Sequence, residues 1–170
     1  MSPTARPAVA HPCVIRHKVD YCCSVLAGVS RQLLYRLQSI LNTAARLVFS
    51  VRRSEHITPL LRELHWLRVP ERITFHLCGL THRCFNGSVP AYLTENIRLT
   101  ANVEIHHHLR SSTTTTLVVP PVQRCTLGDR AFPVAAPRVW NSLPPSLRNV
   151  SSLVPFRHQL KTFLFVHSFD

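Results

Sequence analysis

Residues 30–53 read SRQLLYRLQSILNTAARLVFSVRR, and this stretch decides the fold that we expect for the chain. Placed at about 100° per residue, its side chains separate into two faces. The apolar face consists of Leu33, Leu34, Leu37, Ile40, Leu41, Ala44, Ala45, Leu47 and Val48. The polar face consists of Arg31, Tyr35, Arg36, Gln38, Ser39, Asn42, Thr43 and Arg46. Because neither Gly nor Pro interrupts the stretch and Ser30 is a suitable N-cap, the pattern predicts one long amphipathic helix.

The polar face of this helix has two interpretations. It can contact an anionic partner, or it can be the solvated side of an ordinary core helix. The charge of the whole chain favours the first interpretation, because 20 basic residues against 8 acidic ones give a net charge of +12. Such a charge points to phosphate polymers or anionic surfaces as partners. Eighteen of the basic residues are arginines, whose planar guanidinium groups suit bidentate contacts with phosphate.

The composition excludes several classes of protein. A chain of 170 residues that is 45% apolar and 16% charged is too hydrophobic for general disorder and long enough for one modest domain. No window approaches the ~20 consecutive apolar residues of a membrane span, and the first residues lack the apolar core of a signal peptide. We therefore expect no membrane partner and an intracellular location, nuclear or cytoplasmic, in which the six cysteines are reduced thiols.

The chain divides into four parts by composition. Residues 1–18 have prolines and no periodicity, which predicts a disordered leader, whereas residues 19–99 contain successive helical patterns. Residues 100–116 include a His and Ser/Thr run and predict a linker. Residues 117–170 begin with the β-prone run LVVPPV, continue through a Pro-rich stretch around Trp140 and end in a helix. The expected fold is mainly α: a small helical bundle, then an irregular Pro-rich segment with a short strand and a C-terminal helix.

Further helices follow from local signals. Thr58 and Pro59 supply an N-cap and an N1 proline for a short helix that ends before Pro70. Pro70 opens a third helix, which the C-terminal signal Asn86-Gly87 ends, and residues 90–99 predict one more short helix. In the last helix, which Ser151 or Ser152 can cap, one face contains Phe156, Leu160, Phe163, Leu164 and His167. The side chains that we expect in the core include Leu37, Ile40, Leu77, Leu80, Trp140 and Leu160.

The histidines and cysteines of the third helix give only a weak signal for chemistry. His76 and Cys84 project from nearly the opposite side of that helix to Cys78 and His82. One helix cannot direct all four side chains to a tetrahedral zinc ion, so we expect ordinary helix side chains and no metal or other cofactor. The run His106–His108 predicts a solvated linker, and neither a GxSxG sequence nor a recognisable cysteine motif indicates a nucleophile.

Four blocks of the sequence, taken in order, resemble a known protein family. They read DYCCSVLAGVSRQLLYRLQSILNTAARLVF, HITPLLRELHWLRVPERITFHLCGLTHRCFNGSVPAYL, LGDRAFPVAAPRVWNSLPPSLRN and FRHQLKTFLF. This set is similar to the C-terminal end of the reverse transcriptase of non-LTR (LINE-type) retrotransposons, in the jockey-like branch. The resemblance covers roughly residues 19–169. It implies a thumb domain and the segment after it, an RNA or DNA partner, and contact with an upstream palm domain.

The chain departs from that family where catalysis is concerned. The RNA-directed DNA polymerase centre of the family uses an aromatic-Ala-Asp-Asp turn and a third carboxylate to hold two divalent metals, and it lies upstream of the matched blocks. In this chain no two carboxylates are adjacent, and the only aspartates are Asp20, Asp129 and Asp170. The N-terminal endonuclease of the family has no counterpart, Cys23 stands where Asn is usual, and His82 stands where an aromatic residue is usual. We therefore expect a fragment without a catalytic centre, not an enzyme.

The sequence leads to one main hypothesis and two alternatives. The main hypothesis is binding of RNA or DNA with low specificity through phosphate contacts. The first alternative is a protein-interaction module whose exposed apolar stripes pack on another domain, and the second is a retroelement remnant with no selected role. The arginines that we expect to contact phosphates are Arg31, Arg36, Arg46, Arg52, Arg53, Arg72 and Arg83.

Overall fold

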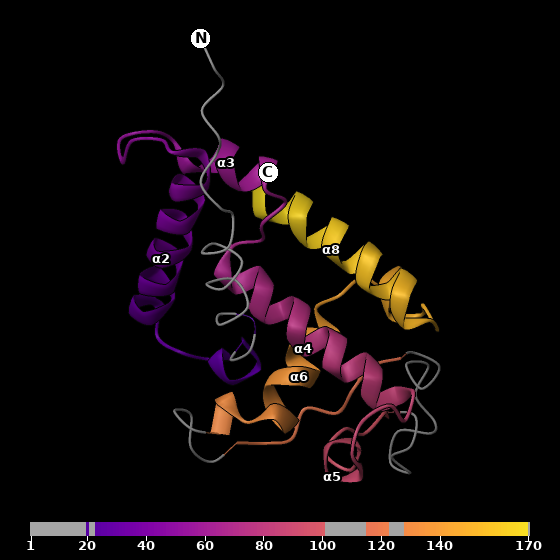
Figure 1. Ribbon diagram of the computed structural model, residues 1–170. Coiled ribbons are helices and arrows are strands. Elements are labelled where there is room, and N and C mark those ends of the chain that lie inside the picture. Colours follow the sequence, from indigo (N-terminus) through magenta and orange to yellow (C-terminus); the bar gives the residue numbers. More distant parts are fainter. Residues whose placement is uncertain (1–19, 21–22, 101–114, 123–127, 170) are drawn as a thin grey trace.

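The computed structural model describes residues 20, 23–100, 115–122 and 128–169, and this part of the chain is mainly helical (Figure 1). The leader predicted for residues 1–18 and most of the predicted linker lie outside the described residues. Two of the helices, η1 and η5, are short 3-10 helices and the rest are α-helices. In chain order the helices are η1 (Cys23–Leu26), α2 (Arg31–Phe49), α3 (Ile57–Glu63), α4 (Val69–Phe85), α5 (Ala91–Thr94), η5 (Gly128–Arg130), α6 (Phe132–Asn141), α7 (Pro145–Arg148) and α8 (Leu153–Phe169).

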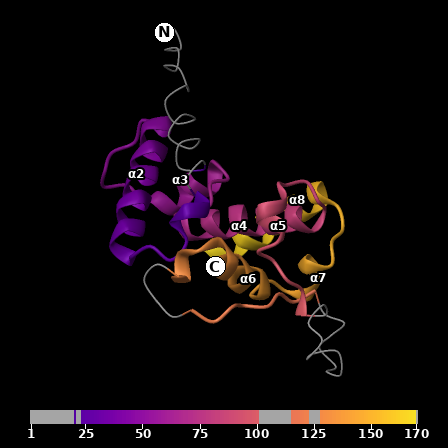
Figure 2. The same cartoon turned by 90° about the horizontal axis from the view of Figure 1, so that it is seen from below.

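Helix α4 is the centre of the molecule. It packs against α6 and α8 and also contacts η1, α2 and α5 (Figure 1, Figure 2). The helix begins as the sequence predicts, because Pro70 occupies the first turn, where its missing N–H costs no hydrogen bond. It ends at Phe85 with Asn86 as the C-cap, and Gly87 follows with φ +62°, a conformation that glycine adopts without a steric penalty. Two hydrophobic clusters form along its length.

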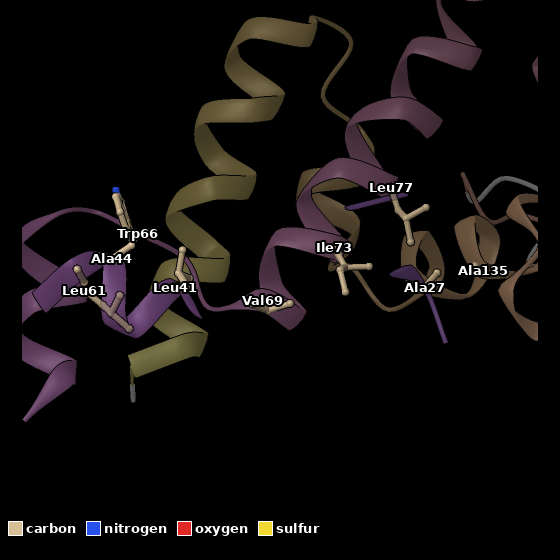
Figure 3. Close-up of a cluster of buried hydrophobic side chains, with 10 residues drawn as sticks. Ala27, Leu41, Ala44, Leu61, Trp66, Val69, Ile73, Leu77 and Ala135 are labelled. Atoms are coloured by element: carbon tan, nitrogen blue, oxygen red, sulfur yellow. The ribbon is translucent and has the colours of Figure 1, made fainter. Parts of the chain in front are cut away.

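The first cluster, here called the α2 cluster, joins the apolar face of α2 to α3 and to the first half of α4 (Figure 3). Leu41, Ala44 and Ala45 of α2 are buried in it against Leu61 and Val69. Ala135 of α6 is also a buried member, so the cluster extends to the C-terminal part of the chain. The other buried members are Ala27, Trp66, Ile73 and Leu77.

The second cluster, here called the Trp140 cluster, lies between α4, α6 and α8. Trp140 and Phe156 are fully buried in it, and their ring centroids are 5.6 Å apart. His82 of α4 is buried beside them and stacks on Phe156 at 4.4 Å, while its Nε2 bonds to the carbonyl oxygen of Val150 at 2.8 Å. The other buried members are Leu67, Cys78, Leu117, Leu143, Leu147, Leu160 and Leu164.

Several predicted boundaries differ from the structure. Helix α2 ends at Phe49, inside the stretch of residues 30–53 that has the helical pattern, because Ser50 adopts the left-handed conformation with φ 53° and closes the helix. Helix α3 begins at Ile57, with His56 in the N-cap position that we predicted for Thr58. The predicted short helix over residues 90–99 is limited to α5.

The predicted short strand and irregular Pro-rich segment are wrong. Leu117 makes only an isolated antiparallel bridge with Leu99, and no longer ladder forms in the described residues. The Pro-rich stretch contains the ten-residue helix α6. Pro133 lies in its first turn, where proline is compatible with a helix, and Pro137 lies inside it. Burial of the α6 side chains from Val134 to Pro137 and of Trp140 offsets the hydrogen bond that Pro137 cannot donate.

The predicted core residues have different degrees of burial. Leu77, Trp140 and Leu160 are buried, and Leu37 is partly buried against the α2 cluster. Leu80 is also partly buried. Ile40, in contrast, is 50% exposed and does not belong to the core, because α3 and α4 cover only the side of α2 that carries Leu41 and Ala45.

The predicted division between residues 19–99 and 117–170 is not visible as two separate cores. The α2 cluster contains Ala135, and the Trp140 cluster contains Leu67 and Cys78 of the N-terminal part. None of the described helices combines the length and the hydropathy that a membrane span requires.

Candidate nucleic-acid interface

The solvent side of α2 and the loop after it is basic, and Glu55 is the one acidic residue of that segment, at the end of the loop. Between Ser30 and Ser54 the sequence has five arginines and neither Asp nor Glu. The helix forms without acidic side chains in its first turn, so burial of Leu41, Ala44 and Ala45, not compensation of the helix dipole, stabilises it. An unbalanced positive field therefore surrounds the exposed side of α2.

A hollow lies on this basic side, between α2 and the loop that follows it. We call it the arginine hollow. It has a volume of about 680 Å³, within the range of pockets that hold small molecules, and Arg46 and Arg53 both line it. The other polar residues that line it are Tyr35, Gln38, Ser39, Asn42, Thr43 and Ser50. Its lining is therefore rich in hydrogen-bond donors, and none of the described residues that line it carries a carboxylate, which suits an anion.

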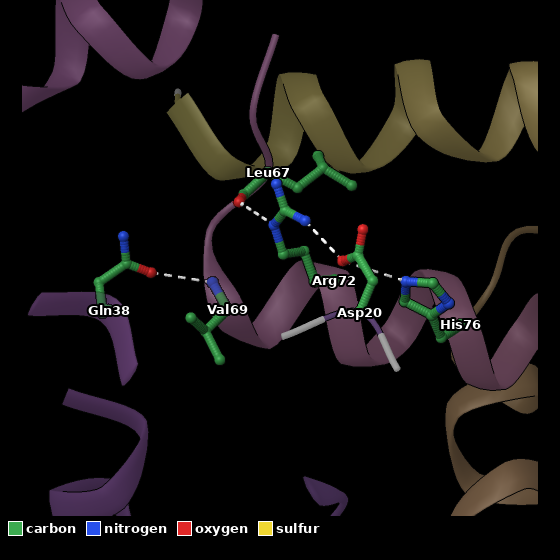
Figure 4. A network of polar contacts seen from close by, with 6 residues as sticks. All are labelled: Asp20, Gln38, Leu67, Val69, Arg72 and His76. Atoms are coloured by element: carbon green, nitrogen blue, oxygen red, sulfur yellow. Dashed lines mark hydrogen bonds and ion pairs between the residues drawn. The ribbon is translucent and has the colours of Figure 1, made fainter. Parts of the chain in front are cut away.

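Hydrogen bonds hold several of the residues that line the arginine hollow. The side-chain amide of Gln38 donates to Oδ1 of Asn42 at 2.8 Å, and its Oε1 accepts the backbone N–H of Val69 at 2.9 Å (Figure 4). Arg46 is half-buried, and its guanidinium donates to the backbone oxygen of Glu55 at 3.3 Å, which ties the loop to the helix. Arg53 is exposed at the rim. Arg46 thus has a structural contact, whereas the charge of Arg53 faces solvent.

Tyr35 stands at the junction of the arginine hollow with a second hollow. The second hollow has a volume of about 420 Å³, and Arg31, Arg68 and Glu71 line it together with Tyr35. The ring of Tyr35 is 72% exposed, so it is available to stack on a nucleobase. Because Glu71 contributes a carboxylate to the second hollow, the arginine hollow is the better place for a phosphate.

No family model, curated protein or solved structure matches this chain. The family resemblance of the sequence therefore stays a prediction.

The structure brings together only some of the arginines that the sequence predicts as phosphate contacts. Arg46 and Arg53 share the arginine hollow, and Arg31 lines the hollow beside it. Arg36 and Arg52 are exposed but line neither hollow.

Two of the predicted phosphate contacts lie on α4, away from the α2 surface. Arg83 is exposed and lines a pocket that α4 and α8 form.

The other, Arg72, is in the interior. Its side chain is buried, Nε donates to the backbone oxygen of Leu67 at 3.0 Å, and NH1 pairs with Asp20 at 2.6 Å (Figure 4). These contacts satisfy the guanidinium inside the protein, so the prediction that Arg72 contacts a phosphate is wrong. Arg68, which the sequence analysis did not single out, lines the second hollow instead.

The histidines and cysteines of α4 lie in the interior or at its edge. Cys78 and Cys84 are buried, and burial raises the pKa of both thiols above their ordinary value. His76 contacts Asp20 at 3.4 Å, and His82 belongs to the Trp140 cluster. Among the described residues, no three His, Cys, Asp or Glu side chains gather as metal ligands do.

Proposed function

We propose that this chain binds single-stranded RNA or DNA through phosphate contacts at the arginine hollow. The observation that carries the proposal is the hollow of about 680 Å³ that is lined by Arg46 and Arg53, has no acidic residue among its described lining and is bordered by the exposed Tyr35. Arginines that bind the backbone, next to an aromatic side chain on which bases stack, are the usual elements of a single-strand site. The proposed function is binding alone, with no catalytic step.

The sequence supports this proposal independently of the hollow. The net charge of +12 favours a polyanionic partner, and the resemblance to the thumb of LINE-type reverse transcriptases implies a nucleic acid. An intracellular location, nuclear or cytoplasmic, and contact with an upstream palm domain are parts of the same proposal. Stacking and phosphate contacts carry little sequence information, so the proposed binding has low specificity.

Binding should depend steeply on salt, because each phosphate contact releases counterions. Replacing Arg31 and Arg53 with glutamine removes two exposed charges beside Tyr35 and leaves the contact of Arg46 intact. The slope of log affinity against log salt should then fall by up to about 1.4, at ~0.7 per contact on a single strand. Fluorescence anisotropy of a labelled oligouridine and the matching oligothymidine, over a series of salt concentrations, measures this slope.

The matched control for this experiment is the double variant Arg98→Gln, Lys161→Gln. Both side chains are exposed, and the variant loses the same two charges away from α2. We expect the slope of log affinity against log salt for this control to equal that of the unmodified chain within experimental error. Equal slopes for the two variants would show that binding depends only on total charge, and the site proposed on α2 would be wrong.

A second function is favoured by the apolar residues that α2 leaves exposed. Leu33, Ile40 and Leu47 follow one another at intervals of seven residues and are 45%, 50% and 65% exposed. A row with this spacing lies along one side of a helix, in the manner of a coiled-coil seam. We propose as the alternative function that this row packs against another protein surface.

Self-association through this row is measurable by sedimentation velocity over a range of concentrations. We expect the unmodified chain to associate at high concentration and the Leu33→Gln, Leu47→Gln variant to stay monomeric, because the variant removes exposed apolar area. The control is Val154→Gln, Val166→Gln, which changes two exposed apolar residues of α8. If both variants or neither of them reduced association, the α2 row would not be the contact surface.

A further inference from the structure

A second basic site lies between α4 and α8, away from the arginine hollow. A pocket of about 220 Å³ is lined there by His76, Gly79 and Arg83 of α4, by Arg157 of α8, and by Asp20. Arg83 and Arg157 are both exposed and belong to different helices, which the fold brings to the same pocket. Two arginines that converge on one small pocket form an arrangement suited to a compact anion.

The charges around this pocket are strongly unbalanced. No Asp or Glu occurs between Arg72 and Ser88, or between Arg130 and Phe169. Among the described residues, Asp20 is the one acidic residue that lines the pocket, and it pairs with Arg72 at 2.6 Å and contacts His76 at 3.4 Å (Figure 4). Because Arg72 compensates Asp20 inside the protein, the charges of Arg83 and Arg157 are left for a ligand.

We propose that this pocket binds a phosphate group, held by Arg83 and Arg157. Its volume of about 220 Å³ is below the 300–1,000 Å³ that is typical of pockets for drug-sized ligands, so it accommodates a phosphate but not a whole nucleotide. The chemistry is the same for free inorganic phosphate and for the terminal phosphate of a nucleic-acid strand. The inference does not rest on the proposed function, because no residue of α2 lines the pocket.

Neighbouring side chains prepare the pocket for this ligand. The guanidinium carbon of Arg157 lies 5.4 Å from the ring centroid of Phe75, a cation–π contact that holds the side chain toward α4. Gly79 leaves the side of α4 open, since a Cβ built there meets no atom within 4 Å. A phosphate can therefore approach the helix between the two arginines.

The test is a titration with sodium phosphate at constant ionic strength, followed by two-dimensional amide NMR spectra. We expect saturable shifts of the amides around Gly79 and Arg83, and at least a tenfold weaker affinity in the Arg83→Gln, Arg157→Gln variant. A second variant, Gly79→Leu, keeps both charges but fills the pocket and suits a helix better than glycine, so it should also lose binding. Shifts that persist in both variants, or no saturable shift, would overturn the proposal.

Two further experiments are needed. The first distinguishes free phosphate from the terminal phosphate of a strand, and the second distinguishes this proposal from the proposed function. If the natural ligand is a strand terminus, an oligonucleotide with a 5′-phosphate should bind at least tenfold more tightly than the same oligonucleotide with a 5′-hydroxyl. Equal affinities assign the pocket to free phosphate. The Arg31→Gln, Arg53→Gln variant should keep the phosphate shifts while its salt slope for single strands falls, so either proposal can fail without the other.

Discussion

Replacing Trp140 with alanine should lower the free energy of unfolding by about 3–5 kcal/mol, a large part of the 5–15 kcal/mol that is typical of a domain. Trp140 is 1% exposed, and its Nε1 donates to the backbone oxygen of Thr115 at 2.8 Å. The substitution leaves a cavity between α4, α6 and α8 and removes the donor from that oxygen. Urea denaturation followed by far-ultraviolet circular dichroism measures the change, since it does not depend on the lost fluorophore.

The control for this substitution is Tyr92→Ala. Tyr92 is also aromatic but is 66% exposed on α5, so its removal should change the free energy of unfolding by no more than about 0.5 kcal/mol. A Trp140→Ala variant as stable as Tyr92→Ala would contradict the central position of Trp140 in the second cluster.

Replacing Arg72 with alanine should lower the free energy of unfolding by about 2–3 kcal/mol. The substitution breaks the pair with Asp20 and the hydrogen bond to Leu67, and it leaves a partly buried carboxylate that keeps its contact with His76 but has lost the guanidinium. Removing one partner of a buried ion pair usually costs about 3–5 kcal/mol. We expect a smaller loss of stability for this pair because the side chain of Asp20 is still 22% exposed to solvent. A double-mutant cycle with Asp20→Asn measures the interaction energy of the Arg72–Asp20 pair separately from the energy of the other contacts of Arg72.

The same pair makes the stability depend on pH. Burial alone would raise the pKa of Asp20, but the hydrogen bond from His76 and the positive charge of Arg72 outweigh it and hold the pKa below the ordinary value of 3.8. The unfolded chain therefore binds the proton more readily, so the stabilisation is present above pH 3.8 and is lost as the pH falls through the lower folded pKa. The difference in stability between the unmodified chain and Asp20→Asn should be constant at neutral pH and should shrink below pH 3.8. A difference that does not change with pH would contradict the pairing.

The sequence predicts most helices of this fold because their signals are local. The start of α4 at Pro70 and its end before Gly87 depend on residues within one turn of each boundary. The early end of α2 could not be predicted in this way, since Ser50 adopts a left-handed conformation that glycine or asparagine usually adopts. The sequence does not predict helix α6, because prolines usually interrupt a helix, although one of the prolines of α6 lies in the first turn, where it is tolerated.

The candidate site could be predicted only where it depends on a single helix. The places of Arg31, Tyr35 and Arg46 follow from the periodicity of α2. Arg53 is also predicted as a phosphate contact, but its place beside Arg46 in the arginine hollow depends on the path of the loop, which no local pattern predicts. Arg72 and Arg83 belong to the same flank of α4, and no local pattern separates them. They differ because Asp20, fifty-two residues before Arg72, pairs with it, whereas Arg83 lies beside Arg157.

The sharing of both clusters between distant parts of the chain has a consequence for synthesis in the cell. Leu41 is buried in a cluster that Ala135 and Phe169 complete, and Phe169 is 128 positions further along the chain (169 minus 41). At translation rates of about 5–20 residues per second, Phe169 is synthesised roughly 6–26 seconds after Leu41. During that interval α3 and α4 can already cover Leu41, but the part of the cluster that Ala135 and Phe169 cover stays exposed on the nascent chain, where apolar surface favours aggregation.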